Sequence, residues 1–85
     1  MKMDIRLQNV ESDAEIERLT ECIGRDNELV ALRERLRKSA ELSYSQGDIS
    51  ADRFLTRIDD EYQARLTADI HEIERLRELY RMREE

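Results

Sequence analysis

The amino-acid sequence predicts an all-α protein, an antiparallel two-helix coiled-coil hairpin with long arms that we expect to self-associate. Three observations predict this fold. The 85 residues include no proline and only two glycines, so little interrupts a helix. Charged residues make up 42% of the chain and aromatic residues 5%, which is typical of long or coiled-coil helices. Finally, one glycine, Gly47, lies where one helical pattern stops and a second begins.

The turn is specified by stop and start signals in one short stretch. Gly47 can adopt the left-handed backbone conformation that ends a helix, because it has no side chain to clash. Ser50 can cap a following helix by accepting a hydrogen bond from a free backbone N–H group. Ile49 and Phe54 have the spacing of a hydrophobic staple, which would fix the angle at which the second helix leaves the turn. We therefore expect the chain to reverse at Gly47.

These signals predict a single hairpin over residues 1–85, with a helix over about 4–46, a turn over 47–49 and a helix over about 50–83. The first helix begins either near Asp4 or at Ser12, where residues 12–15 form a capping-box pattern. We prefer the early start because no residue between Asp4 and Ser12 opposes a helix. Each arm would be roughly 50 Å long at about 1.5 Å per residue.

Each predicted helix carries apolar side chains three and four residues apart, which is the spacing of one buried face. In the first helix these are Ile16, Leu19, Ile23, Leu29, Val30, Leu32, Leu36, Ala40 and Tyr44. In the second they are Leu55, Ile58, Tyr62, Leu66, Ile70, Ile73, Leu76 and Tyr80. We predict that these two faces form the seam between the helices. Because two helices can bury only one stripe each, the core is small, and we expect self-association to complete it.

Two details of the pattern predict how the helices pack. The spacing from Leu55 to Leu66 gives an 11-residue repeat, which favours straight or slightly right-handed packing. The apolar pattern of the first helix is interrupted over residues 24–27, where we expect its phase to shift. Gly24, within this interruption, could also mark the close approach of another helix.

Composition and motifs argue against several classes of function. The net charge is −6, with basic and acidic residues alternating, so we expect no nucleic-acid partner. No apolar run approaches the roughly 20 residues needed to span a bilayer, so we expect no direct membrane insertion by this chain. No signal peptide is recognised, so we expect the chain as written to be soluble or cytoplasmic. No phosphate-binding loop, nucleophile elbow or paired-cysteine motif is present, so we expect neither an enzyme nor a bound cofactor.

The remaining residues that could carry chemistry are expected to be structural. His71 is the only histidine, and a metal site or general base would need partners on the same helix face. Cys22 is a single cysteine beside the apolar positions, with no histidine close in sequence to activate it. The acidic residues Asp59, Asp60 and Glu61 lack the glycine-containing loop of a calcium site, so we expect them on the helix surface. We predict no catalytic or metal-binding residues.

A longer pattern around the turn resembles a known family. Tyr44-Ser45-x-Gly47, a leucine eight residues after the glycine, and Tyr62-Gln63-Ala64-Arg65-Leu66 look like the second periplasmic helical hairpin of TolC-family outer-membrane efflux proteins. The likeness is closest to Bacteroidetes members, which have similar stretches at positions matching residues 26–33 and 71–73. It covers roughly residues 16–80 of this chain. In that family three protomers form a long periplasmic α-helical tunnel.

The resemblance implies that the turn lies at the periplasmic tip of the tunnel, where an adaptor protein of the efflux pump binds. The partner-binding residues expected from it are Gly47, Asp48, Ile49, Ser50, Phe54 and Leu55. The chain departs from the family in having Arg53 where an acidic residue is common, so no contact that relies on that carboxylate carries over. Residues 80–85 also differ from the small-residue exit that is typical of the family.

Two functions from different classes are therefore expected. In one, the hairpin is a segment of an efflux duct that works by assembly with other helices and an adaptor. In the other, it is a free-standing coiled-coil interaction module that pairs into a dimeric four-helix bundle. A duct segment predicts apolar positions on a second side of each helix, for which the candidates are Leu29, Ala31, Leu42, Ala64 and Ala68.

Overall fold

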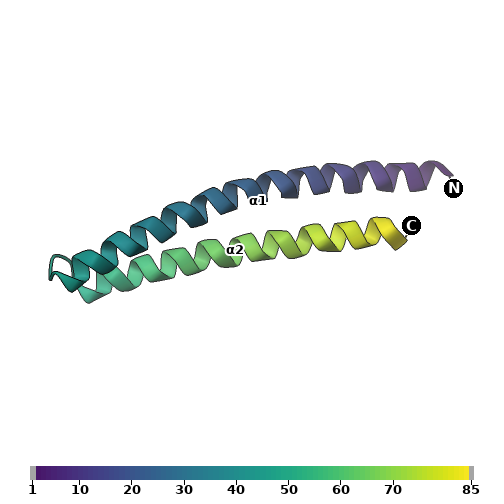
Figure 1. Cartoon of the computed structure of the whole chain (residues 1–85). Helices are drawn as coiled ribbons and strands as arrows, with labels where there is room; N and C mark the ends of the chain where they lie inside the picture. Colours follow the sequence, from purple (N-terminus) through teal and green to yellow (C-terminus); the bar gives the residue numbers. More distant parts are fainter. Residues whose placement is uncertain (1, 85) are drawn as a thin grey trace.

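The chain folds as a helical hairpin, which confirms the predicted fold class (Figure 1). The computed structural model describes the backbone of residues 2–84 and the side chains of residues 11–83. Helix α1 spans Lys2–Ser45 and helix α2 spans Ala51–Glu84, and together they form a rod 67 Å long. Helix α1 therefore begins near the earlier of the two predicted starts, at Lys2, and not at Ser12. Residues 1 and 85 of the predicted hairpin lie outside the described residues.

Helix α1 ends two residues before the predicted glycine, Gly47, in a hydrogen-bonded motif. Gly47 has a φ of 79°, which is the left-handed conformation that only glycine adopts without strain. Its N–H donates to the carbonyl of Tyr44 at 3.0 Å, and the N–H of Asp48 donates to the carbonyl of Ser43 at 2.8 Å. These two bonds form a Schellman motif, which satisfies carbonyls that the end of a helix leaves free.

Helix α2 begins at the predicted cap. The Oγ of Ser50 accepts a hydrogen bond from the backbone N–H of Arg53 at 3.3 Å, as expected for a helix N-cap. Asp52 in the first turn complements the positive end of the helix dipole. The contact observed for Phe54 is a stack on Tyr44, with ring centroids 5.2 Å apart and an interplanar angle of 24°. This aromatic stack therefore joins the two helices across the turn.

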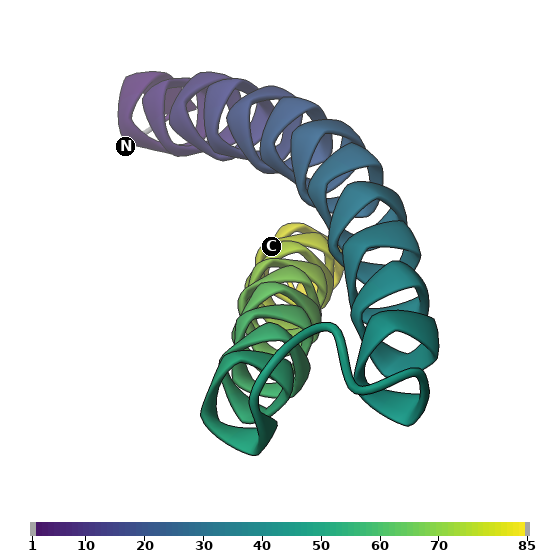
Figure 2. The same cartoon turned by 90° about the vertical axis from the view of Figure 1, so that its left-hand side faces the viewer.

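The seam between the helices follows a heptad repeat. The least exposed positions alternate by three and four residues: 19, 23, 26, 30, 33, 37 and 40 on α1, and 61, 64, 68, 71, 75, 78 and 82 on α2. This is the spacing of a coiled coil, so the predicted 11-residue packing repeat is wrong for the seam. Viewed from the turn, α1 curves across α2 rather than running straight beside it (Figure 2).

The buried apolar side chains of the seam are few and mostly small. They are Leu19, Ile23, Ala40, Ala64 and Ala68. Alanine at three of these positions leaves room for the two backbones to approach closely. Asp26 occupies a seam position, so the heptad continues through residues 24–27 without the predicted phase shift. Gly24 is exposed, and a Cβ atom built there would meet nothing within 4 Å, so it marks no close helix contact within this chain.

Most of the apolar residues that the sequence pattern assigned to the seam are exposed. We call Leu29, Leu32 and Leu36 the first-helix stripe; their exposed fractions are 40%, 44% and 36%. The second-helix stripe is exposed between 40% and 61% and comprises Leu55, Ile58, Tyr62, Leu66, Ile70, Ile73, Leu76 and Tyr80. The prediction that Tyr62 and Tyr80 belong to the core is therefore wrong. At about 100° per residue, the second-helix stripe lies roughly 150° around α2 from the seam.

Candidate functional site

The centre of the seam holds a buried carboxylate between two arginines. Glu61 is only 9% exposed. One of its oxygens accepts a hydrogen bond from Nε of Arg37 at 2.8 Å, and the other accepts from Arg65 at 3.0 Å. Arg37 also donates to Glu41 at 3.0 Å. The expectation that Glu61 lies on the helix surface is wrong; its heptad spacing from Ala64 and Ala68 is the signal that could have placed it in the seam.

These hydrogen bonds favour the charged forms of both partners. The bond from Arg37, and after it the bond from Arg65, holds the pKa of Glu61 below its usual range against the opposing effect of desolvation. The same bond raises the pKa of Arg37. Ionised Glu61 therefore contributes to the contact between the helices.

Acid should weaken the hairpin through Glu61. Because its folded-state pKa is lowered, the stability it contributes is present above the unfolded pKa of about 4.3 and is lost as pH falls through the folded value. We expect the Tm to fall between about pH 5 and pH 3, and to fall less steeply in Glu61→Gln. Circular dichroism melts across this range measure both. Glu72→Gln, at an exposed position, is the control, and parallel curves for the wild type and Glu61→Gln would contradict the prediction.

Three further polar pairs link the helices, one of them between Arg65 and Glu34 at 3.6 Å. Nδ1 of His71 contacts Oδ2 of Asp26 in a half-buried pair across the seam. Arg33 pairs with Asp60 at 3.1 Å, and both side chains are partly exposed. In each pair the partners lie at similar distances from the turn, as expected for an antiparallel hairpin. This position of His71 agrees with its expected structural role.

Among side chains 11–83, no group of three or more His, Cys, Asp or Glu residues could hold a metal ion. Cys22 is half-buried, with its Sγ 3.9 Å from Arg18 and 4.0 Å from Arg25. Within residues 2–84, neither helix contains a segment long and apolar enough to cross a bilayer.

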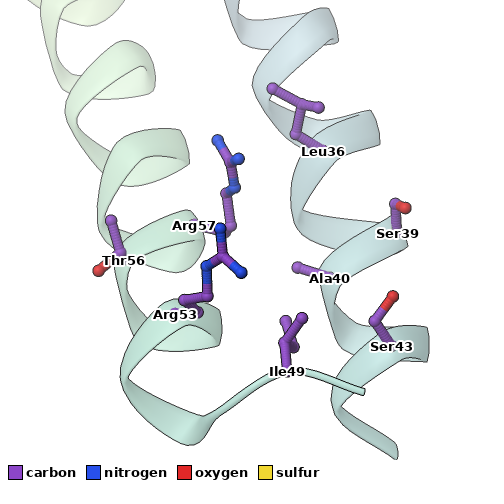
Figure 3. A pocket seen from close by; sticks show the side chains of 8 residues that line it. All are labelled: Leu36, Ser39, Ala40, Ser43, Ile49, Arg53, Thr56 and Arg57. Atoms are coloured by element: carbon purple, nitrogen blue, oxygen red, sulfur yellow. The ribbon is translucent and has the colours of Figure 1, made fainter. Parts of the chain in front are cut away.

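Beside the turn lies an open groove of about 440 Å³ (Figure 3). The turn contributes Ile49, and α2 contributes Arg53 and Arg57, whose side chains extend into the space between the helices. The other lining residues are Leu36, Ser39, Ala40, Ser43 and Thr56. We call this the turn groove. It combines the apolar side chains of Leu36, Ala40 and Ile49 with two guanidinium groups, and no carboxylate is among the described residues that line it.

The structure separates the predicted partner-binding residues. Gly47, Asp48 and Ser50 are exposed in the turn, Ile49 lines the turn groove, and Phe54 is half-buried against Tyr44. Leu55 is exposed and belongs to the second-helix stripe. Arg53 and Arg57 were not among the expected partner-binding residues. Their spacing of four, which puts them on one helix face beside the turn, is the signal that could have found them.

The two apolar stripes lie on different sides of the hairpin. Leu36 lines the turn groove, and Leu29 lines a second, smaller groove of about 190 Å³ between the helices. Helix α2 contributes to these two grooves Arg53, Thr56, Arg57, Asp60, Gln63, Ala64 and Thr67, and no residue of the second-helix stripe. We call the side that carries both grooves the groove face. The second-helix stripe points away from α1 instead.

Comparison of this chain with family models, curated proteins and solved structures found no match. The function is therefore inferred from the positions of the grooves and of the exposed apolar stripes.

Proposed function

We propose that this hairpin is a wall segment of a periplasmic helical duct like that of TolC-family efflux proteins. It acts by assembly with other helices along its sides and with an adaptor protein at its turn, and not by catalysis. The observation that carries the proposal is the second-helix stripe, which covers the length of α2 and which α1 leaves uncovered.

The exposed apolar area of the second-helix stripe indicates that it binds a partner. Its eight large apolar side chains are about half exposed, which amounts to on the order of 700 Å². Stable protein interfaces bury about 800 Å² on each partner, and apolar patches of this size on soluble proteins usually mark interaction sites. The stripe could therefore supply most of the area that a stable interface buries on one partner.

The two stripes point in different directions, which favours a closed wall of several hairpins over a dimer of two. A two-fold dimer uses one surface patch on each subunit, so it would cover the first-helix stripe or the second-helix stripe but not both. Covering both requires a neighbour on each of two sides. Subunits in a closed wall have such neighbours, and this favours the duct over a dimeric four-helix bundle.

The turn supports the second part of the proposal. Its conformation is fixed by the left-handed Gly47, the Ser50 cap and the aromatic stack, so it presents a defined surface at one end of the rod. The exposed Leu55 and the turn groove give that end both apolar and cationic character. An adaptor docking at the tip, as the resemblance implies, would use this surface.

Introducing charge into the second-helix stripe should abolish assembly. We expect the wild-type chain to form oligomers larger than a dimer, and Leu66→Glu with Ile70→Glu to be monomeric, because each glutamate would have to be desolvated in the interface. Sedimentation equilibrium over a range of concentrations measures the association state. Circular dichroism checks that the variant stays helical, as expected for residues that do not contribute to the seam.

Thr20→Glu with Asn27→Glu is the matched control, because it adds the same charge at exposed positions outside both stripes. This control should assemble like the wild type. A wild-type dimer that resists further association would favour the four-helix module instead. A wild-type monomer at high concentration would contradict both functions.

A further inference from the structure

We infer that the partner covering the second-helix stripe is another copy of this chain, which presents its groove face with the two turns side by side. In this contact Asp52 and Asp59 of one copy meet Arg53 and Arg57 of the next. The inference rests on the proposed function and deepens it, because it names both surfaces of the wall contact and the alignment of the copies.

The groove face carries two exposed arginines near the turn, one without an ion pair and one with a long one among the described side chains. Within the described side chains, Arg53 forms no ion pair, and the only pairing of Arg57 is with Asp60 at 4.0 Å. Both guanidinium groups border an apolar floor formed by Leu36, Ala40 and Ile49. A surface that combines an apolar strip with two cations fits an apolar helix face that is flanked by carboxylates.

The second-helix stripe has that character near the turn. Asp52 and Asp59 stand seven residues apart, so they lie on one side of α2 and flank Leu55, Ile58 and Tyr62. Both aspartates are exposed, and neither forms an ion pair with the side chains that the structure describes. One hairpin therefore carries two complementary surfaces on different sides.

The charges also select the relative direction of the copies. The aspartates and arginines all lie in the first three turns of α2, so copies aligned in parallel and in register place them at the same height. In an antiparallel alignment the far end of the stripe would face the turn groove. Arg77 flanks the stripe there, and it would meet Arg53 and Arg57 with like charge, which opposes the contact.

A contact between two different surfaces repeats from copy to copy. Such a heterologous interface leaves a free stripe on one end copy and a free groove face on the other, so it continues until the assembly closes on itself. Near the turn, it covers Leu55, Ile58 and Tyr62 of one copy and Leu36 of the next, which lines the turn groove.

Charge reversal with rescue by mixing tests the inference. The groove-reversed chain carries Arg53→Glu with Arg57→Glu, and the stripe-reversed chain carries Asp52→Arg with Asp59→Arg. We expect each alone to associate about tenfold more weakly than the wild type, because both would bring like charges together. An equimolar mixture should recover assembly, with the two chains alternating. Native mass spectrometry of the mixture reads the composition directly.

Asp13→Arg with Glu17→Arg is the control, because it makes the same charge change as the stripe-reversed chain at exposed positions far from the turn. It should assemble normally. Arg53→Glu alone keeps the reversal testable if the groove-reversed chain loses helicity, because it gives the Ser50 cap the glutamate of a capping box. It should also weaken association.

The failure of this inference differs from the failure of the proposed function. If the wild type assembles but the reversed chains assemble equally well, or the mixture shows no preference for alternation, the groove face is not the docking surface and the inference falls. If the wild type does not assemble, the proposed function falls with it.

Discussion

Ala68→Leu should destabilise the hairpin by about 1–3 kcal/mol, which is the usual effect of inserting extra methylenes into a packed core. Ala68 is 6% exposed and lies in the heptad seam with Ala64 and Ala40, where the small side chains set the distance between the helices. A leucine there must push the helices apart. That would lengthen the hydrogen bonds of Glu61, which lies one heptad earlier. Thermal and urea denaturation followed by circular dichroism measure the loss.

Ala31→Leu is the matched control, because Ala31 is exposed on α1 and outside the seam. It should leave the free energy of unfolding nearly unchanged. Both positions had been expected on a second, outer side of the helices. Equal tolerance of leucine at Ala31 and Ala68 would mean that Ala68 faces outward, which would contradict its place in the seam.

Gly47→Val should cost about 1–2 kcal/mol in stability, because a side chain disfavours the left-handed conformation. The φ of Gly47 is 79°, and valine is among the residues least tolerant of that region. A Cβ at Gly47 would meet no atom within 4 Å, so the cost arises from the backbone conformation alone. A lowered Tm in circular dichroism melts would report it.

Gly24→Val separates this effect from a general loss of glycine. Gly24 has the same open surroundings but lies in a helix with an ordinary φ, where valine is about as favourable as glycine or slightly better. We expect its Tm to stay close to that of the wild type. Gly47→Asn should fall between the two, because asparagine tolerates the left-handed region. An unchanged Tm for Gly47→Val would show that this residue leaves the conformation in solution.

The sequence predicted the features that depend on local chemistry. Two long helices follow from composition and the absence of proline, and the reversal follows from Gly47 and Ser50 because each acts on its own backbone or on that of the next turn. The prediction failed where the choice was between competing faces. The large apolar residues of α2 are a stronger pattern than Ala64 and Ala68, yet the alanines form the seam.

The reason is that an apolar stripe indicates burial without naming the partner. A helix in an assembly can bury one face within its own hairpin and another against a neighbour. The periodicity of apolar residues shows which faces are hydrophobic, but not which partner covers each face. The pairing of Glu61 with Arg37 joins residues 24 positions apart, and that of His71 with Asp26 joins residues 45 apart. Such contacts depend on the register of the two helices, which no single-helix pattern contains.

The candidate site divides in the same way. Ile49 was expected at the partner surface, and it lines the turn groove. Arg53 had been noted only as a departure from the resembled family, and its position beside Arg57 at the groove becomes visible once both helices are in place (Figure 3). Residues whose role depends on contact with the other helix required the structure. Residues that shape their own turn, such as Gly47 and Ser50, could be predicted from the sequence.

The ion pairs of the seam also disfavour packing of the two helices in a wrong register. If α2 slipped by one heptad, Glu61 would lie opposite Val30 or Tyr44 in place of Arg37, and a carboxylate would be desolvated without a counter-ion. The alanines beside it tolerate almost any neighbour and could not reject the error. In a crowded array of similar helices, this penalty would disfavour exchange of helices between hairpins, so each copy would keep its own pair while its outer faces remain free to bind neighbours.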